Sequence, residues 1–222
     1  MTESLLLPCQ GVLFDCDGVL VDSDASVHSA WGRWATEHGL DPATVVAMVY
    51  GRRSTDTVAA LVAPQAHAAA LARVVHLEVE EAHTVPAVPG AVELVTTMAP
   101  GTWSVVTSAV RVLALARLSA AGFPSPGVLV TGDDVDAGKP DPQGYLAGAA
   151  GLGLAPADTV VLEDAVAGVR AARAAGVGAV VGVGERALQT DADLVVADLR
   201  ALRWTRDGLT AAGPGGLRAT AG

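Results

Sequence analysis

Short apolar runs alternate with helical patterns along most of the chain. The runs are rich in Val and Leu and contain few polar positions, which is typical of strands that are covered on both faces. We expect strands at 11–14, 102–107, 128–131, 159–162, 179–183 and 194–196. Helical spacing of apolar residues predicts helices between them at 91–98, 112–121, 143–151 and 166–175. This alternation predicts an α/β fold with a doubly wound, Rossmann-like parallel sheet.

The segment between the first two strands follows a different pattern. It contains no convincing strand run and predicts helices at 25–38, 43–50, 55–62 and 65–82. Pro42 and Pro64 suit the first turns of the second and fourth of these helices, and Ser54 is placed to cap the third. Both ends of the insert lie near the end of the first strand. The insert can therefore close over the carboxyl ends of the strands as a lid.

These patterns divide the chain into two parts and a tail. We expect an α/β core at 1–20 and 89–208 with an inserted all-α cap domain at 21–88. The tail at 209–222 consists mainly of Ala, Gly, Pro and Thr, and we expect it to be flexible because it has too little apolar surface to fold by itself. No apolar window is long enough for a membrane span, and the first residues lack the basic region of a signal peptide.

Composition and charge narrow the classes of function. Of 222 residues, 51% are hydrophobic and 17% are charged, which indicates a globular protein. The formal net charge of −10 argues against nucleic acid or an acidic membrane as the main partner. A small anionic substrate is still allowed, because local cations can reverse the field inside a pocket. Cys9 and Cys16 stand at opposite ends of the first strand, too far apart for a disulfide, so we expect a reduced, cytoplasmic protein.

Polar side chains follow the ends of four predicted strands. They are Asp15 and Asp17 after the first strand, Thr107 and Ser108 at the second, Lys139 after the third, and Glu163 and Asp164 at the fourth. Because ligands of parallel sheets bind at this edge, we expect these side chains to meet there. Several carboxylates in one pocket cannot all stay ionised without compensation. A hard divalent cation, with Mg²⁺ the best candidate, would supply that compensation together with the lysine.

Lys139 stands out because it is the only lysine among 14 lysine and arginine residues. An ammonium is a compact point charge that fits between crowded oxygens, whereas a guanidinium is a planar fork. The alternative interpretation is a surface lysine in a loop next to proline. Phosphoryl transfer suits this set of residues, since it requires charge stabilisation on three equatorial oxygens. A carboxylate nucleophile would divide that reaction through an aspartyl-phosphate.

Four motifs in this order resemble those of the haloacid dehalogenase-like (HAD) hydrolase superfamily. They are Asp15-Cys16-Asp17-Gly18, Thr107-Ser108, Gly138-Lys139-Pro140 and Glu163-Asp164. The insert after the first motif resembles the subclass with a helical cap. Within that subclass the chain looks similar to sugar- and polyol-phosphate phosphatases, such as those of glycerol 3-phosphate and 2-deoxyglucose 6-phosphate. β-Phosphoglucomutase is a nearby relative.

The resemblance implies a role for each motif residue. It implies that Asp15 is the nucleophile, that Asp17 is the general acid/base, and that Mg²⁺ is held by Asp15, Asp164 and the backbone carbonyl of Asp17. Glu163 is expected beside the metal or as an occasional ligand. The phosphoryl oxygens of the substrate are assigned to Thr107, Ser108 and Lys139.

Three residues of the insert are candidates for contact with the substrate. His28 lies on the first predicted helix, where mutase-like relatives carry a histidine near the nucleophile; the alternative is an ordinary, partly exposed helix residue. Arg52 and Arg53 lie together in a loop, from which one of them could reach distal hydroxyls or a second phosphate. Trp31 and Trp34 are expected to pack the cap rather than to stack on a sugar.

The sequence therefore predicts a Mg²⁺-dependent phosphatase of small phosphorylated sugars or polyols. The first alternative is a sugar phosphomutase of the β-phosphoglucomutase type, and the second is a catalytically silent phosphate-binding protein with the same fold. The absence of lysine from the cap and a short segment before Pro89 favour hydrolysis over mutase activity. We expect a small phosphorylated metabolite as partner, no nucleic acid or membrane, and a monomer or weak homodimer.

Overall fold

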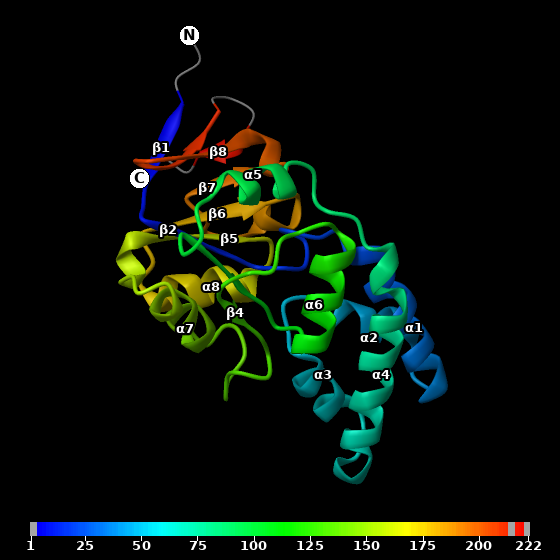
Figure 1. The fold of residues 1–222 in the computed structure, drawn as a ribbon. Coiled ribbons are helices and arrows are strands. Elements are labelled where there is room, and N and C mark those ends of the chain that lie inside the picture. Colours follow the sequence, from blue (N-terminus) through cyan, green and yellow to red (C-terminus); the bar gives the residue numbers. More distant parts are fainter. Residues whose placement is uncertain (1–3, 213–215, 220–222) are drawn as a thin grey trace.

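The computed structural model describes residues 4–212 and 216–219. Its main sheet has the strand order β10-β7-β6-β5-β2-β3-β4 (Figure 1). The strands from β7 to β4 are parallel, and β10 pairs antiparallel with β7. Their bounds are β2 (Gly11–Phe14), β3 (Trp103–Val106), β4 (Leu129–Val130), β5 (Thr159–Glu163), β6 (Ala179–Val183), β7 (Leu194–Val196) and β10 (Gly216–Ala219). The predicted α/β fold with a parallel sheet is confirmed.

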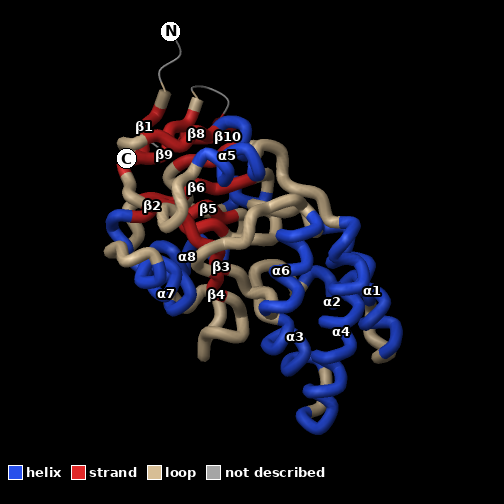
Figure 2. Tube along the Cα trace, in the orientation of Figure 1, coloured by secondary structure: helices blue, strands red, loops and turns tan. Residues whose placement is uncertain are grey.

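Helices pack on both faces of this sheet (Figure 2). One apolar core joins the sheet to α5 and part of α6, and the other joins it to α7 and α8. Successive side chains of β2 alternate between the cores, because Val12 and Phe14 lie in the first and Leu13 in the second. The helix bounds are α5 (Ala91–Thr97), α6 (Arg111–Ala120), α7 (Gln143–Gly151) and α8 (Val166–Ala175).

The helices of the insert have an apolar core of their own. Trp31 and Trp34 are buried in it, as expected, with ring centroids 5.4 Å apart. The two connections to the sheet region run side by side, since the backbone N–H of Asp22 donates to the carbonyl of Pro86. The helices are α1 (Asp24–Glu37), α2 (Pro42–Ala47), α3 (Ser54–Leu61) and α4 (His67–Glu81). The division into a core at 1–20 and 89–208 and a cap at 21–88 stays a prediction.

The ends of the helices refine the predicted bounds. Pro42 stands in the first turn of α2, as expected. Pro64 opens a short 3-10 turn ahead of α4 rather than α4 itself. The prediction that Ser54 caps α3 is wrong, because the extended residue before the helix is Arg53 and Ser54 is already helical. No side chain caps this helix end.

The prediction of a flexible tail at 209–222 is wrong for the part that the structure describes. β9 (Gly208–Ala211) pairs antiparallel with β1 (Leu5–Pro8) and with β8 (Leu202–Thr205) in a second, three-stranded sheet. Leu209 is fully buried, because it belongs to one of the apolar cores of the main sheet. β10 extends the main sheet. The remainder of the predicted tail lies outside the described residues, at 213–215 and 220–222.

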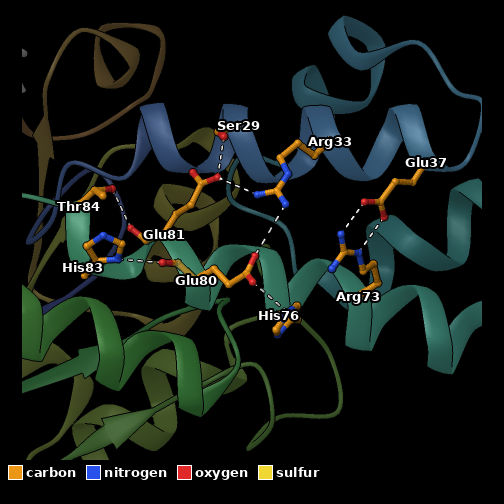
Figure 3. Close-up of polar contacts among 9 residues, drawn as sticks. All are labelled: Ser29, Arg33, Glu37, Arg73, His76, Glu80, Glu81, His83 and Thr84. Carbon is orange, nitrogen blue, oxygen red and sulfur yellow. Dashed lines mark hydrogen bonds and ion pairs between the residues drawn. The ribbon is translucent and has the colours of Figure 1, made fainter.

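Exposed ion pairs join α1 to α4 along one side of the insert (Figure 3). Arg33 reaches Glu80 and Glu81, and Arg73 forms two hydrogen bonds with Glu37, at 2.8 and 2.6 Å. We call this group the α1–α4 seam. Its members are Arg33, Glu37, Arg73, His76, Glu80 and Glu81.

Two further observations bear on the sequence-based expectations. Cys9 and Cys16 are both free thiols, as their spacing predicted. Among the described residues, no helix combines the length and the apolar character needed to cross a membrane.

Candidate active site

Three buried carboxylates meet at the carboxyl edge of the sheet. β2 pairs with β5 so that Phe14 lies opposite Leu162, and this register brings Asp15 beside the Glu163 and Asp164 pair. One oxygen from each of these three carboxylates lies within 4.8 Å of the others. The exposed fractions are 7% for Asp15, 1% for Glu163 and 6% for Asp164. The edge is also where strand order reverses around β2, the usual ligand position of such sheets.

Lys139 holds this cluster together. Its Nζ donates to Asp15 Oδ1 at 2.6 Å and to Glu163 Oε1 at 2.5 Å. Burial lowers the pKa of Lys139, but the charges of the two carboxylates outweigh this effect and raise that pKa well above its usual value. Lys139 therefore stays an ammonium. The single lysine of the chain lies where its position in the sequence predicted, between crowded oxygens.

Glu163 is fully occupied by protein donors. Its Oε1 also accepts from the Tyr145 hydroxyl at 2.8 Å, and its Oε2 accepts from the backbone N–H groups of Asp164 and Ala165 at 2.8 and 3.0 Å. A Cβ at Gly168 would overlap this carboxylate, so the first turn of α8 is shaped to admit it. Glu163 positions Lys139 and the strand end. Tyr145 escaped the sequence analysis, although a hydroxyl-bearing aromatic in a helix of small residues signals a buried hydrogen bond.

Asp164 carries an arginine partner that the sequence analysis did not single out. Arg186 donates to Asp164 Oδ2 from Nη2 at 2.6 Å and from Nε at 3.0 Å. Burial and the charge of Glu163 raise the pKa of Asp164 to about 7, against the opposing effect of Arg186. Arg186 also donates to Asp24 of α1 at 2.7 Å and lies over the ring of Tyr50. It ties the insert to the strand end, and nothing in its local sequence distinguishes it.

The carboxylate of Asp17 is bound by Arg117 rather than by the cluster. Arg117 Nη1 donates to Asp17 Oδ1 at 2.8 Å. The group of three carboxylates close enough to share a cation contains Glu163 and not Asp17. The predicted metal set of Asp15, Asp17 and Asp164 is therefore brought together only in part. The expected contact through the backbone carbonyl of Asp17 stays a prediction.

A pocket lies above this edge, between the sheet and the insert. Its walls include Asp15, Asp17, Thr107, Ser108 and Asp164 from one side and Trp31, Tyr50, Arg52 and Glu78 from the other. Thr107 is buried, and its Oγ1 accepts from the backbone N–H of Ala109 at 3.0 Å. The Ser108 hydroxyl donates to the carbonyl of Gly51 at 3.4 Å. Both predicted hydroxyl residues thus reach the pocket, with their orientations fixed.

The three candidates from the insert lie in different places. Arg52 lines the pocket and has no side-chain hydrogen bond or ion pair within the described part of the chain. Arg53 forms two hydrogen bonds with Asp56, both at 2.9 Å, and donates to backbone carbonyls of the core loop before Lys139. His28 Nε2 lies 2.6 Å from the Tyr50 hydroxyl, outside this pocket. The arrangement brings Arg52 to this pocket and leaves His28 outside it, whereas Arg53 lines a neighbouring pocket with Thr107, Ser108 and Lys139.

The cluster fits a hard divalent cation. Asp15 and Asp164 offer it carboxylate oxygens, the ligands which Mg²⁺ and Ca²⁺ prefer, whereas Glu163 is committed to protein donors. Burial raises the pKa of Asp15 well above its usual value; Lys139 opposes this rise, and Glu163 and Asp164 add to it. Lys139 and Arg186, which Asp164 shares with Asp24, do not balance the three carboxylates, and a divalent cation would offset the excess negative charge.

Comparisons with known proteins agree with this geometry. A family model described as a haloacid dehalogenase-like hydrolase matches residues 9–176. Hexitol phosphatase A of Escherichia coli (strain K12) is 40% identical over 173 residues, 76% of this chain and 80% of that protein. β-Phosphoglucomutase of Bacillus subtilis (strain 168) is 51% identical over 59 residues, 27% of this chain and 26% of that one. A solved hydrolase structure from Pseudomonas syringae aligns with a TM-score of 0.78 and 25% identity, covering 87% of this chain and 95% of that chain.

Proposed function

The chain belongs to the haloacid dehalogenase-like hydrolase family, and we propose that it is a Mg²⁺-dependent phosphatase of small phosphorylated sugars or polyols. The observation that carries this proposal is the buried cluster of Asp15, Glu163 and Asp164, held by Lys139 beneath a pocket that Asp15 and Asp164 line. The similarity to a hexitol phosphatase over most of both chains supports a polyol phosphate as the substrate class. We assign the reaction to the phosphoric monoester hydrolases.

Asp15 is the nucleophile of the proposed reaction. Its carboxylate oxygen attacks the phosphorus atom, the bond from phosphorus to the leaving oxygen breaks, and Asp17 gives its proton to that oxygen. Water then attacks the phosphorus atom of the aspartyl-phosphate and loses a proton to Asp17. The bond between phosphorus and Asp15 breaks, which releases phosphate and restores both carboxyl groups.

The remaining residues bind and orient. Lys139 fixes the Asp15 carboxylate, and Glu163 fixes Lys139. Thr107 and Ser108 bind the phosphoryl oxygens. Asp15 and Asp164, with the backbone carbonyl of Asp17, would hold Mg²⁺, which when bound neutralises charge on the phosphoryl group.

The helical segment at 21–88 is proposed to act as the cap that selects the substrate. It contributes Trp31, Tyr50 and Arg52 to the wall of the pocket. An aromatic surface together with an uncommitted guanidinium suits a small hydroxyl-rich molecule, since arginine donors pair with oxygens in a fixed geometry. Arg52 is the residue of the cap that we assign to the distal part of the substrate.

Hydrolysis of a panel of sugar and polyol phosphates tests the proposal. Asp15→Asn should abolish turnover, because an amide is not a nucleophile, and EDTA should abolish turnover of the unaltered protein until Mg²⁺ is restored. Asp207→Asn is the matched control, since Asp207 is an exposed aspartate in the turn between β8 and β9. Turnover that survives either Asp15→Asn or metal removal contradicts the mechanism.

A sugar phosphomutase is the second candidate. The high local identity to β-phosphoglucomutase over 59 residues favours it, although this match covers only about a quarter of either chain. A mutase returns the phosphoryl group to a second sugar-phosphate hydroxyl instead of to water. Product analysis separates the two functions: conversion of a hexose 1-phosphate to the 6-phosphate, without release of phosphate and stimulated by a bisphosphate, would establish the mutase.

A further inference from the structure

A buried arginine stands between Asp17 and the helical insert. The side chain of Arg117 in α6 is only 2% exposed. Its Nη1 donates to Asp17 Oδ1 at 2.8 Å, and its Nη2 donates to Glu78 Oε1 at 3.1 Å. One guanidinium therefore uses two arms of its fork on two carboxylates from different parts of the chain, and all three side chains line the pocket.

Glu78 connects this arginine to α4. The Glu78 side chain is 4% exposed, and α4 packs against α6 around Leu113 and Ala114, with Val79 beside them. The contact between the two helices is therefore apolar around a single buried ion pair. Because Glu78 is fixed within this contact, its carboxylate determines where the guanidinium of Arg117 can lie.

Arg117 holds one oxygen of Asp17 and leaves the other open. Asp17 Oδ2 accepts no hydrogen bond from the residues that the structure describes, and the side chain is 27% exposed on the pocket wall. A proton can pass only between groups within hydrogen-bond reach. Because Arg117 anchors Oδ1, the free Oδ2 of Asp17 stays directed at one place.

We propose that Arg117 is a positioning residue for Asp17, and that Glu78 holds Arg117 so that the contact between α4 and α6 sets the direction of the Asp17 carboxylate. This inference rests on the proposed function, in which Asp17 protonates the leaving oxygen. A single hydrogen bond from the guanidinium would be enough to pair with Glu78. Arg117 also donates to Asp17, and this second hydrogen bond is our reason for connecting Arg117 with the reaction.

The leaving group of the substrate separates positioning from a purely structural role. p-Nitrophenolate leaves without the help of an acid, whereas the alkoxide of a polyol phosphate needs a proton as the bond breaks. A displaced Asp17 should therefore lower kcat/KM, which reports phosphoryl transfer to Asp15, for a polyol phosphate and spare it for p-nitrophenyl phosphate. Overall kcat does not separate the two substrates in this way, because both share the hydrolysis of the aspartyl-phosphate. A loss of folded protein would slow both substrates equally.

The decisive variant is the double change Arg117→Met with Glu78→Gln. It removes both buried charges at once, so that no uncompensated carboxylate is left between α4 and α6. We expect kcat/KM for a hexitol phosphate to fall roughly 10- to 100-fold, the usual cost of a misplaced catalytic group. We expect kcat/KM for p-nitrophenyl phosphate to fall by less than about threefold, because general acid catalysis contributes little to its first step.

Two further variants complete the experiment. Arg117→Lys keeps the charge and should show the same pattern in weaker form, and it is the variant to measure if the double variant does not fold. Arg111→Met is the matched control, because Arg111 is an exposed arginine on the same helix, paired with Asp134. The control should leave both substrates unaffected.

The outcomes separate failure of this inference from failure of the proposed function. Equal loss of kcat/KM on both substrates, or full activity on both, in folded Arg117 variants overturns the positioning role. If Asp17→Asn shows the dependence on leaving group and the Arg117 variants do not, only the inference falls. If the unaltered protein hydrolyses neither substrate, the proposed function falls and takes the inference with it.

Discussion

Two groups of ion pairs in this protein lie in different surroundings. The α1–α4 seam joins two helices of the insert (Figure 3). Its Arg33 and Glu80 side chains are 49% and 47% exposed. Around the pocket, Lys139 and Glu163 are 8% and 1% exposed. Water and salt screen the seam, so its pairs contribute little to stability. The pocket pairs are not screened in this way.

The difference indicates which charges serve the reaction. Removing charges from water costs free energy that mutual attraction often fails to recover. A surface ion pair avoids this cost. A buried ion pair is expected where it positions a side chain that the reaction needs. Two sets of charges are buried in this way. One lies at the strand ends and consists of Asp15, Lys139 and Glu163, and the other is the pair of Arg117 and Glu78 beside Asp17. The seam can therefore vary with small effect, whereas the pocket pairs should not tolerate the loss of one partner.

Lys139→Met should have the largest effect. It would leave the Asp15 and Glu163 carboxylates buried without their cation, and removal of one partner from a buried pair costs about 3–5 kcal/mol. Urea denaturation should show that loss, and turnover should disappear. Lys139→Arg should not restore turnover, because a planar fork does not replace a compact ammonium. Near-normal activity in either variant would contradict the role given to Lys139.

Arg117→Met alone should come next. The buried Glu78 carboxylate would lose its partner, again at a cost of about 3–5 kcal/mol in the free energy of unfolding. Adding Glu78→Gln should recover most of that stability, because no buried charge then remains unpaired. Denaturant unfolding of the two single variants and the double variant forms a double-mutant cycle. Additive losses would mean that Arg117 and Glu78 do not interact as the structure shows.

Mg²⁺ should stabilise the protein through the pocket carboxylates and not through the seam. A ligand that binds only the folded state adds about 2.7 kcal/mol at a concentration 100 times its dissociation constant. Thermal unfolding with Mg²⁺ and with EDTA measures this shift. Asp164→Asn should reduce the shift strongly, and Glu80→Gln should leave it unchanged. An equal shift in both variants would place the metal elsewhere.

The seam should show the smallest effect. The hydrogen bonds from Arg73 lower the pKa of Glu37, so the folded-state value lies below the unfolded one. The pair therefore stabilises the fold above the ordinary glutamate pKa of about 4.3, and this contribution is lost as the pH falls through the lowered value. Arg73→Met should lower the melting temperature slightly near neutral pH and not at all in acid. A large fall in the melting temperature of Arg73→Met at any pH would mean that the seam pairs stabilise the fold as much as the buried pairs do.

The sheet and the pocket carboxylates could be predicted because their signals are local. Continuous apolar runs identify buried strands, and polar residues directly after such runs lie at the ligand-binding edge. Asp15, Thr107 and Asp164 were found in this way. Lys139 was found because the chain uses arginine at every other cationic position.

The missed features depend on partners that are distant in the chain. β1 and β9 pair Leu5 with Ala211, and no local pattern announces that pairing. Arg117 and Glu78 interrupt the apolar stripes of α6 and α4. That interruption could have indicated buried charges, but it does not reveal which residues pair. Whether an arginine of the insert reaches the pocket depends on how the insert lies over the sheet, which spacing does not determine.

Trapping the covalent intermediate tests the central claim most directly. The protein is quenched in acid during turnover of a hexitol phosphate, reduced with borohydride and digested, and its peptides are analysed by mass spectrometry. Borohydride converts an aspartyl-phosphate to homoserine, so our account predicts homoserine at position 15 and at no other aspartate. Turnover that leaves position 15 unmodified, or that marks a different carboxylate, would contradict it.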